Sequence, residues 1–317
     1  MPRRRPAAAV SAADSPSSPA SLAASSASLG RTECPRECPL SARLAVAVVL
    51  LSAALPGAAA AASAKAALPP APETRLRYSV SLAGIPVAKA DLTVSAAADR
   101  YSSHLVWRTS GLVDVFAGAK GDVAASGQLG ARRPVPTTYT LASGDGRKAV
   151  KVMLAMAGGA VKAAEALPPS RQTPDLVPLQ PQHRVDVLDP LSATLLAGKA
   201  DAPDGSGLCR RTLPIFDGWT RYDIRLSPKT TLPNKRAGIS GPIVVCAARY
   251  VPVAGHRAEH KVTRFMTDNE DLSVTFAHLE KADVWVPIRV SVRTLVGVAE
   301  VEADQIAAVG YDQPKTP

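Results

Sequence analysis

The stretch LCRRTLPIFDGWTRYDIRL, residues 208–226, decides our interpretation of the fold. After the pair Asp217-Gly218, apolar residues alternate with charged residues as far as Leu226. A period of two is typical of a half-buried strand, and Asp-Gly is typical of the tight turn that precedes one. A second β-rich run, residues 243–246, follows a loop that contains Pro and Gly and can pair with the first. We therefore expect antiparallel β-structure around this stretch.

Cys209 and Cys246 bracket the stretch and are predicted to form a disulfide. The chain has four cysteines, and the other two, Cys34 and Cys38, lie in an N-terminal segment that export would remove. Disulfides persist in oxidising compartments, so one bridge uses both remaining thiols if the chain is exported. Closing a loop of this length stabilises a fold by about 4 kcal/mol if the effect is entropic.

The N-terminal 64 residues have the composition of a leader and not of a folded domain. Residues 1–30 are rich in Ala, Ser and Pro and lack apolar periodicity. Arg43 then precedes the apolar run 44–51, and an Ala-rich stretch ends at residues 62–64. A positive flank, an apolar core and a small-residue cleavage site are typical of a secretory signal peptide, so we expect cleavage near Ala64.

An uncleaved membrane anchor is the alternative to a cleaved signal. The uncharged residues 44–64 are about long enough to span a bilayer. Pro56-Gly57 interrupts this segment and its second half is mostly Ala, which favours cleavage.

The chain is moderately basic. Of its net charge of +10, residues 1–64 contribute three and the remainder +7. This balance suits anionic lipid head groups or nucleic acid, but it is also a common property of protein surfaces, and we expect no nucleic-acid partner.

Strand patterns dominate the chain after the leader. Alternating runs are separated by turn signals about every ten residues, which favours an antiparallel sheet because parallel strands need long crossovers. The clearest hairpin loop is 143–146, and the strictest alternation is 284–292. We predict a mainly β fold, a single curved antiparallel sheet in the form of a half-barrel or β-spiral, within one domain of residues 75–309. A linker of residues 65–74 precedes it, and a loose tail of residues 310–317 follows.

One short helix is predicted from Leu191 to Ala197. Asp189 can cap it, Pro190 suits its first turn and Gly198 can end it. The segment carries no charge, so we expect it to be buried. The concave side of a curved sheet has to be filled, and we place this helix there.

No catalytic or metal-binding constellation stands out, and we expect no catalytic residue, metal or cofactor. His256 and His260 have the spacing of a helical metal pair, but Glu259 is not where the base of a zinc peptidase lies, and in a strand the two rings are too far apart to share an ion. The sequence has no G-x-S-x-G elbow of a serine hydrolase. Residues 144–148 place basic residues after a Gly-rich turn, which is typical of a hairpin tip and not of a phosphate-binding loop that opens a helix.

Two groups of residues are candidates for binding. The first is a set of arginines in the cysteine-bracketed stretch, whose forked donors match phosphate or carboxylate geometry: Arg210, Arg211, Arg221 and Arg225. The alternative for this group is a solvated strand face with a cross-strand ion pair. The second group consists of leucines in the predicted helix, which either fill the core or line a hydrophobic groove: Leu191, Leu195 and Leu196.

Taken together, these residues resemble the proteobacterial envelope family known as domain of unknown function 3108. The resemblance covers nearly all of the exported part and rests on the following elements: Tyr78-Ser79-Val80 with Gly84, residues 109–113, residues 189–193, Cys209 before Asp217-Gly218-x-x-Arg221-Tyr222-Asp223, and residues 286–290. It implies a periplasmic location and no assigned activity. The expected architecture is also similar to the half-barrels of lipoprotein carriers and to the β-spiral envelope proteins of alphaproteobacteria.

We expect an exported periplasmic protein that binds or scaffolds without catalysis and helps to maintain the cell envelope. In its leading form it holds a lipid, a lipoprotein or a peptide in the concavity of the sheet. In the alternative form it is a purely structural interaction module with a filled concavity, no small ligand and a protein partner at a sheet edge. A hydrolase with an unrecognised site that uses His104, His256 or His278 is the weakest alternative. Contact with a membrane is expected only through the signal segment, if that segment is not cleaved.

Overall fold

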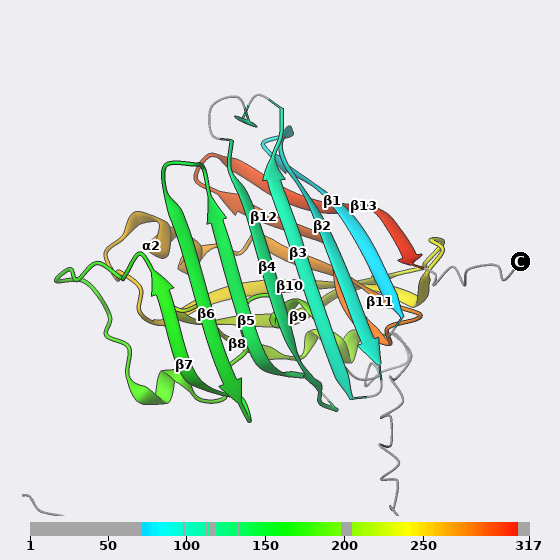
Figure 1. The fold of residues 1–317 in the computed structure, drawn as a ribbon. Coiled ribbons are helices and arrows are strands. Elements are labelled where there is room, and N and C mark those ends of the chain that lie inside the picture. The colour runs from blue at the N-terminus through cyan, green and yellow to red at the C-terminus, as the bar shows by residue number, and fades with distance from the viewer. Residues whose placement is uncertain are drawn as a thin grey trace, which may run out of the picture. The chain divides into compact units, whose positions relative to one another are not determined.

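One antiparallel sheet contains thirteen strands in the part of the chain that the structure describes (Figure 1). This computed structural model describes residues 72–97, 99–111, 113–114, 118–131, 133–197 and 205–309. The chain divides into two units, Met1–Lys65 and Ala66–Pro317, and all described residues belong to the second. The predicted leader with its two cysteines, most of the predicted linker and the predicted tail lie outside the described residues.

The strands are long and regular, because apolar and polar residues alternate along most of them. Their bounds are β1 (Glu73–Leu82), β2 (Ile85–Ala97), β3 (Arg100–Thr109), β4 (Lys120–Leu129), β5 (Pro134–Gly144), β6 (Ala149–Ala157), β7 (Ala160–Leu167), β8 (Thr212–Phe216), β9 (Arg221–Leu232), β10 (Ile239–Ala254), β11 (Leu272–Leu279), β12 (Val284–Thr294) and β13 (Gly297–Val309).

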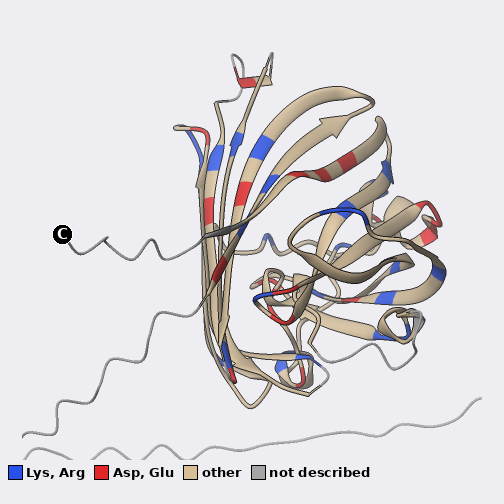
Figure 2. Ribbon diagram, turned by 90° about the vertical axis from the view of Figure 1, so that its right-hand side faces the viewer, with Lys and Arg blue, Asp and Glu red and all other residues tan. Residues whose placement is uncertain are grey.

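The strands lie across the sheet in the order β7-β6-β5-β4-β3-β2-β1-β13-β12-β11-β10-β9-β8. The first seven form a meander of hairpins, and residues 168–211 then carry the chain to the opposite margin. Strands β8 to β13 return until β13 pairs with β1. The sheet curves round on itself, as Figure 1 and Figure 2 show. The predicted fold class, a mainly β chain with a single curved antiparallel sheet, is confirmed.

Helical structure in the described residues is brief. Its bounded elements are the 3₁₀ turns η1 (Pro181–Arg184), η2 (Ser192–Thr194) and η3 (Ser206–Cys209), and the α-helix α2 (Lys261–Asp268), and residues 113–114 are also helical. Within the described residues, none of these helices is long and apolar enough to cross a membrane.

The helix predicted over residues 191–197 is wrong in type and length. Only Ser192–Thr194 form a helical turn, and it is of the 3₁₀ kind. Leu196 exchanges both backbone hydrogen bonds with Trp285, each 2.9 Å long, so the chain is already extended there and cannot continue a helix. The predicted stop at Gly198 lies outside the described residues.

The described residues between β7 and β8, which we call the crossing segment, fill the inner side of the curved sheet. Val187, Leu191 and Leu195 pack in one core with side chains from β1–β6 and β11–β13. Leu188 and Leu196 pack in a second core with side chains from β8–β12. All five side chains are almost completely buried, so the segment is a shared wall of two cores.

The predicted bridge between Cys209 and Cys246 is present in the structure. It joins η3 to β10, and both cysteines are buried in the second core. It therefore fixes the end of the crossing segment to the sheet just before β8 begins.

Candidate functional site

The edge strand β8 is covered by the chain's own backbone. Leu188 donates its N–H to Pro214 O (2.7 Å) and accepts the N–H of Phe216 (2.9 Å), which makes a parallel bridge opposite Ile215. These bonds satisfy groups of β8 that face away from β9. The margin of the sheet at β8 is therefore closed.

The edge strand β7 is not covered in this way. It pairs with β6, and within the described residues no backbone hydrogen bond joins it to any other segment. The side chains in the middle of the strand are all exposed: Lys162, Ala163, Ala164 and Glu165. Figure 1 shows β7 at the free margin of the sheet.

Two contacts hold the chain together beyond the ends of β7. Before the strand, Val187 donates its N–H to Gly159 O (2.9 Å). After it, the indole Nε1 of Trp219 donates to Pro168 O (2.9 Å). The eight residues of β7 lie between these contacts, so its open edge has fixed ends.

The second contact depends on the turn between β8 and β9. The carboxylate of Asp217 accepts the N–H groups of Trp219 (2.8 Å) and Thr220 (2.6 Å) and the Thr220 hydroxyl (2.7 Å). Gly218 has a φ of +104°, and a Cβ there would lie 2.8 Å from Val152 Cγ1. Only glycine fits this conformation and this close approach. The tight turn predicted at Asp217-Gly218 is confirmed, and it presents Trp219 to the end of β7.

A hollow of about 420 Å³ opens where β7 ends and this turn begins. It has walls of mixed polarity: Ala166, Pro169, Ser170, Gln172, Leu176, Pro178, Leu179, Arg184, Gly218, Trp219 and Gly255. The guanidinium of Arg184 also lies 5.7 Å from the centre of the Phe216 ring. A side chain with an apolar body and an acidic or polar tip fits such walls.

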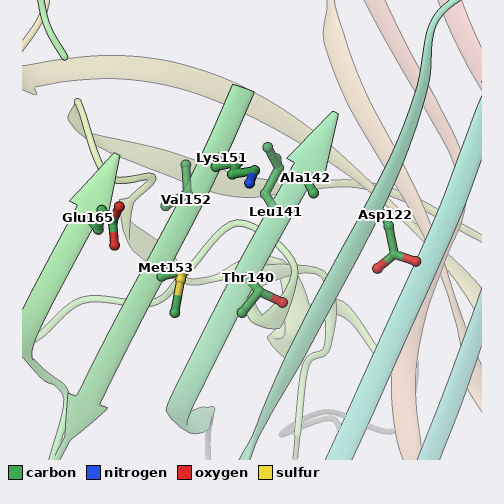
Figure 3. A pocket seen from close by; sticks show the side chains of 8 residues that line it. All are labelled: Asp122, Thr140, Leu141, Ala142, Lys151, Val152, Met153 and Glu165. Carbon is green, nitrogen blue, oxygen red and sulfur yellow. The ribbon is translucent and has the colours of Figure 1, made fainter. Parts of the chain in front are cut away.

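A second, smaller hollow of about 200 Å³ lies on the outward face of β4–β7 (Figure 3). In Figure 3, Met153 of β6 stands between Glu165 of β7 and Thr140 of β5. Met153 is 56% exposed and pairs in register with Glu165. Of these side chains only Glu165 lies on the edge strand itself, and Met153 and Lys151 lie one strand further in, on β6.

A buried polar cluster fixes the crossing segment to β3. The carboxylate of Asp189 accepts the N–H groups of Leu191 (3.0 Å) and Ser192 (2.8 Å), and the Ser192 hydroxyl donates to it at 2.5 Å. The Tyr101 hydroxyl lies 2.6 Å from Ser192 Oγ. Burial raises the pKa of Asp189 to about 6, although its hydrogen bonds oppose the shift. The cluster is closed from solvent, so its function is structural.

Sequence reasoning suggested Asp189 as a helix cap but missed this cluster. Tyr101 and Ser192 are 91 residues apart, and no local pattern connects them. The only signal in the sequence was the family-like element at residues 189–193.

The predicted arginine group does not form one clasp. Arg221 pairs with Asp223 at 2.6 Å, with both side chains about 15% exposed. Arg211 donates to Ala197 O (3.1 Å). Arg210 and Arg225 are exposed, and Arg225 faces Arg249 of β10, so it meets a like charge. Arg221 therefore forms an ion pair, but with a residue of its own strand β9 and mostly buried, so it is neither the predicted cross-strand pair nor a solvated one.

The leucines proposed as a groove lining are core side chains. Leu191, Leu195 and Leu196 are at most 4% exposed and lie in the two cores described above. Their burial favours the core-filling alternative over a groove lining.

One polar chain resembles a hydrolytic triad. Ser240 Oγ lies 2.6 Å from Nδ1 of His278, and Nε2 of His278 lies 3.0 Å from a carboxylate oxygen of Asp283. In serine hydrolases the serine contacts Nε2, and the acid is buried. Here the ring is reversed, and the Asp283 side chain is 92% exposed. The simpler interpretation is a cross-strand pair, since Ser240 is directly opposite His278.

The other histidines are not gathered. His104 pairs with Asp122 on the outward face at 3.0 Å, and His260 immediately precedes α2. Among the described residues, no group of three His, Cys, Asp or Glu side chains could hold a metal ion.

Comparison with known proteins gives a family and no activity. The family described as "Protein of unknown function (DUF3108)" matches residues 77–304. No curated protein matches the chain. A solved structure from Brucella abortus, a β-barrel-like protein of domain of unknown function DUF1849, is similar with 10% sequence identity and a TM-score of 0.39; the match covers 77% of this chain and 99% of that chain.

Proposed function

The chain belongs to the DUF3108 family of proteins of unknown function, and we propose that it is an exported, non-enzymatic binding protein that takes up an extended segment of a protein partner along β7. The observation that carries this proposal is the unequal treatment of the two sheet margins. The crossing segment covers β8, whereas β7 has no backbone partner beyond β6 among the described residues.

Addition of a strand to an open edge is a common way to recognise extended peptides. Main-chain hydrogen bonds give affinity, and pockets for individual side chains give specificity. Here β7 offers the edge, the hollow beside Trp219 lies at its end, and the outward hollow beside Met153 lies on its flank. A partner residue at the end of β7 would combine an apolar body with an acidic or polar tip, because Arg184 and Leu179 share that hollow.

A lipid held in the concavity has less support. The space between the curved strands contains the chain's own Leu191 and Leu195, each almost fully buried. A bound acyl chain would have to displace these side chains and reopen the core, which costs several kcal/mol. We therefore favour the form with a filled concavity and a partner at an edge.

Two features of the chain support export. The leader ends in a small-residue cleavage signal, and Cys209 and Cys246 form a bridge of the kind that persists outside the cytoplasm. The protein is proposed to act in the periplasm, where it would contribute to maintenance of the envelope by holding a protein partner.

The experiment begins with protein exported through its own leader and purified from a bacterial periplasm. A phage library of random linear peptides is selected on this protein, and the enriched peptides are synthesised and titrated calorimetrically. Amide hydrogen exchange then compares free and bound protein. We expect one peptide per chain and slowed exchange confined to β6, β7 and the adjoining Trp219 turn, with no change at β8.

Trp219→Ala is the matched test of the end hollow, and Trp107→Ala is its control in β3. Loss of the indole should weaken the selected peptides about tenfold, since a buried aromatic contact contributes on the order of 1 to 2 kcal/mol. Peptides that slow exchange elsewhere, or a library that yields no binder, would overturn the proposal.

A hydrolase is the second candidate, favoured only by the chain Ser240–His278–Asp283. Fluorophosphonate labelling of the exported protein tests it, with Ser240→Ala as the control. Labelling that Ser240→Ala abolishes would establish a reactive serine. An unlabelled protein that binds peptides along β7 would remove this candidate.

A further inference from the structure

The exposed apolar side chains at one end of the sheet gather on two neighbouring turns. The turn between β1 and β2 presents Ile85, and the turn between β12 and β13 presents Leu295, Val296 and Val298. These four aliphatic side chains are 42 to 70% exposed. The turns are adjacent, because Ala83 donates its N–H to Val298 O (2.8 Å). We call this set of four residues the apolar tip.

A row of cations crosses the outward face of the sheet just below the apolar tip. Lys89 of β2, Arg108 of β3 and Lys120 of β4 are paired in register, so they lie side by side on adjacent strands. All three are exposed, and none has an ion-pair partner among the described residues. Lys89 lies four residues from Ile85, about 13 Å along the strand. Figure 2 shows Lys and Arg segments on the upper part of the strand layer at the left.

The acids nearest to this row are already engaged. Asp91 and Asp122 lie two residues beyond Lys89 and Lys120, further from the tip. Asp91 pairs with Arg77 (3.3 Å), and Asp122 pairs with His104 (3.0 Å). At the turns, Asp114 accepts the Thr109 hydroxyl, and Asp145 accepts backbone N–H groups of its own hairpin. The cation row is thus left free to attract anions.

We propose that this end of the sheet binds the surface of an anionic phospholipid membrane, with the apolar tip inserted and the cation row at the phosphate level. Below Ile85, the cation row on β2–β4 matches the anionic head groups beneath the apolar boundary of a leaflet. Below Val298, β13 carries Glu300 and Glu302, whose charges are engaged by Arg289. An exposed apolar cluster that has no binding partner favours aggregation, so a cluster such as the apolar tip indicates an interaction site. Bound in this way, the protein keeps β7 accessible at the margin of the sheet.

Vesicle flotation tests the inference with protein exported through its own leader. Phosphatidylglycerol–phosphatidylcholine vesicles are compared with phosphatidylcholine alone. We expect binding to the anionic vesicles that weakens with added salt. Val296→Asp should reduce the binding at least about tenfold, because the tip can no longer enter the apolar boundary. Serine in place of Lys89, Arg108 or Lys120 should reduce it about fivefold each.

Matched controls lie away from this end. Leu232→Asp changes a similarly exposed aliphatic residue near the β9–β10 turn, and Lys229→Ser removes a cation from β9; both should bind as the unchanged protein does. All variants share residues 1–64, so differences between them cannot come from that segment. Absence of binding to anionic vesicles, or binding that the cation changes weaken and Val296→Asp does not, would overturn the inference. Peptide binding along β7 is measured on the same variants and should not change, so failure of one proposal leaves the other standing.

Discussion

The two margins of this sheet are edge strands of opposite character. β8 has five residues, of which Leu213, Ile215 and Phe216 are buried, and Leu188 of the crossing segment bonds to its outer side. β7 has eight residues, its middle is exposed, and its outer side has no backbone partner among the described residues. An unprotected edge invites pairing with another chain, so proteins usually cover edges or shorten them.

The difference indicates which margin is structural and which is available. β8 is short, covered and close to the disulfide, so it is part of the core. On β7, only the charges of Lys162 and Glu165 oppose unwanted pairing. Damage at the β8 margin should therefore reduce the stability of the whole fold, and damage at the β7 margin should reduce binding alone.

The largest expected effect is loss of the disulfide at the covered margin. Replacing Cys209 and Cys246 together by Ala should lower the free energy of unfolding by about 4 kcal/mol, because the bridge joins residues that are 37 positions apart and both cysteines are buried. Urea unfolding of the variant and the parent measures this. A decrease below about 1 kcal/mol would show that the β8 margin does not depend on the bridge.

Truncating the side chain whose backbone covers β8 comes next. Leu188→Ala should lower the free energy of unfolding by about 3 kcal/mol, since the side chain is 1% exposed in the second core. Val185→Ala is the matched control, because Val185 lies in the same segment and is 58% exposed, and its free energy should hardly change. Equal effects of the two changes would contradict the view that this segment is a core wall.

The sequence was informative wherever a residue's partner was close along the chain. Alternation located β12 at residues 284–294 almost to the residue, and Asp217-Gly218 located the turn. The disulfide followed from counting cysteines. The arrangement of the crossing segment could not be predicted in this way, because it depends on contacts between residues far apart in the sequence, such as Leu196 and Trp285.

The element that matters most for the proposed function was missed. β7 reads Ala-Val-Lys-Ala-Ala-Glu-Ala-Leu, and its residues favour a helix by intrinsic propensity. It is a strand because β6 offers a ladder to it. An edge strand of low intrinsic β-propensity that pairs with one neighbour is stabilised when a second strand pairs with its free side. This is consistent with addition of a partner strand to β7.

The buried carboxyl of Asp189 should make stability depend on pH. Its pKa in the folded protein is about 6, against 3.8 for an exposed aspartate, so the folded state holds the proton more strongly. The contribution of Asp189 to the free energy of unfolding should therefore fall as pH rises from 4 to 6, by at most about 3 kcal/mol. Asp189→Asn keeps an acceptor for the N–H of Ser192 and cannot ionise. The difference between parent and variant isolates this group, and a difference that does not vary with pH would contradict the assignment.

The smallest effect on stability, and the sharpest test of the comparison, comes from proline in the middle of β7. Neighbouring N–H groups of a strand point to opposite sides, so of Ala163 and Ala164 one donates to β6 and the other faces the open edge. Ala163→Pro and Ala164→Pro are thus matched variants on one strand. The proline that removes the donor to β6 should destabilise the fold by about 2 to 3 kcal/mol.

The proline that removes the outward donor should leave the free energy of unfolding within about 0.5 kcal/mol of the parent, because that N–H bonds to water in the free protein. It should nevertheless weaken the selected peptides about tenfold, since it removes one main-chain bond and places a ring where the added strand lies. Thermal unfolding and calorimetric titration on both variants separate these outcomes. If neither proline weakens peptide binding, the open margin is not the binding edge, and the difference between β7 and β8 concerns folding alone.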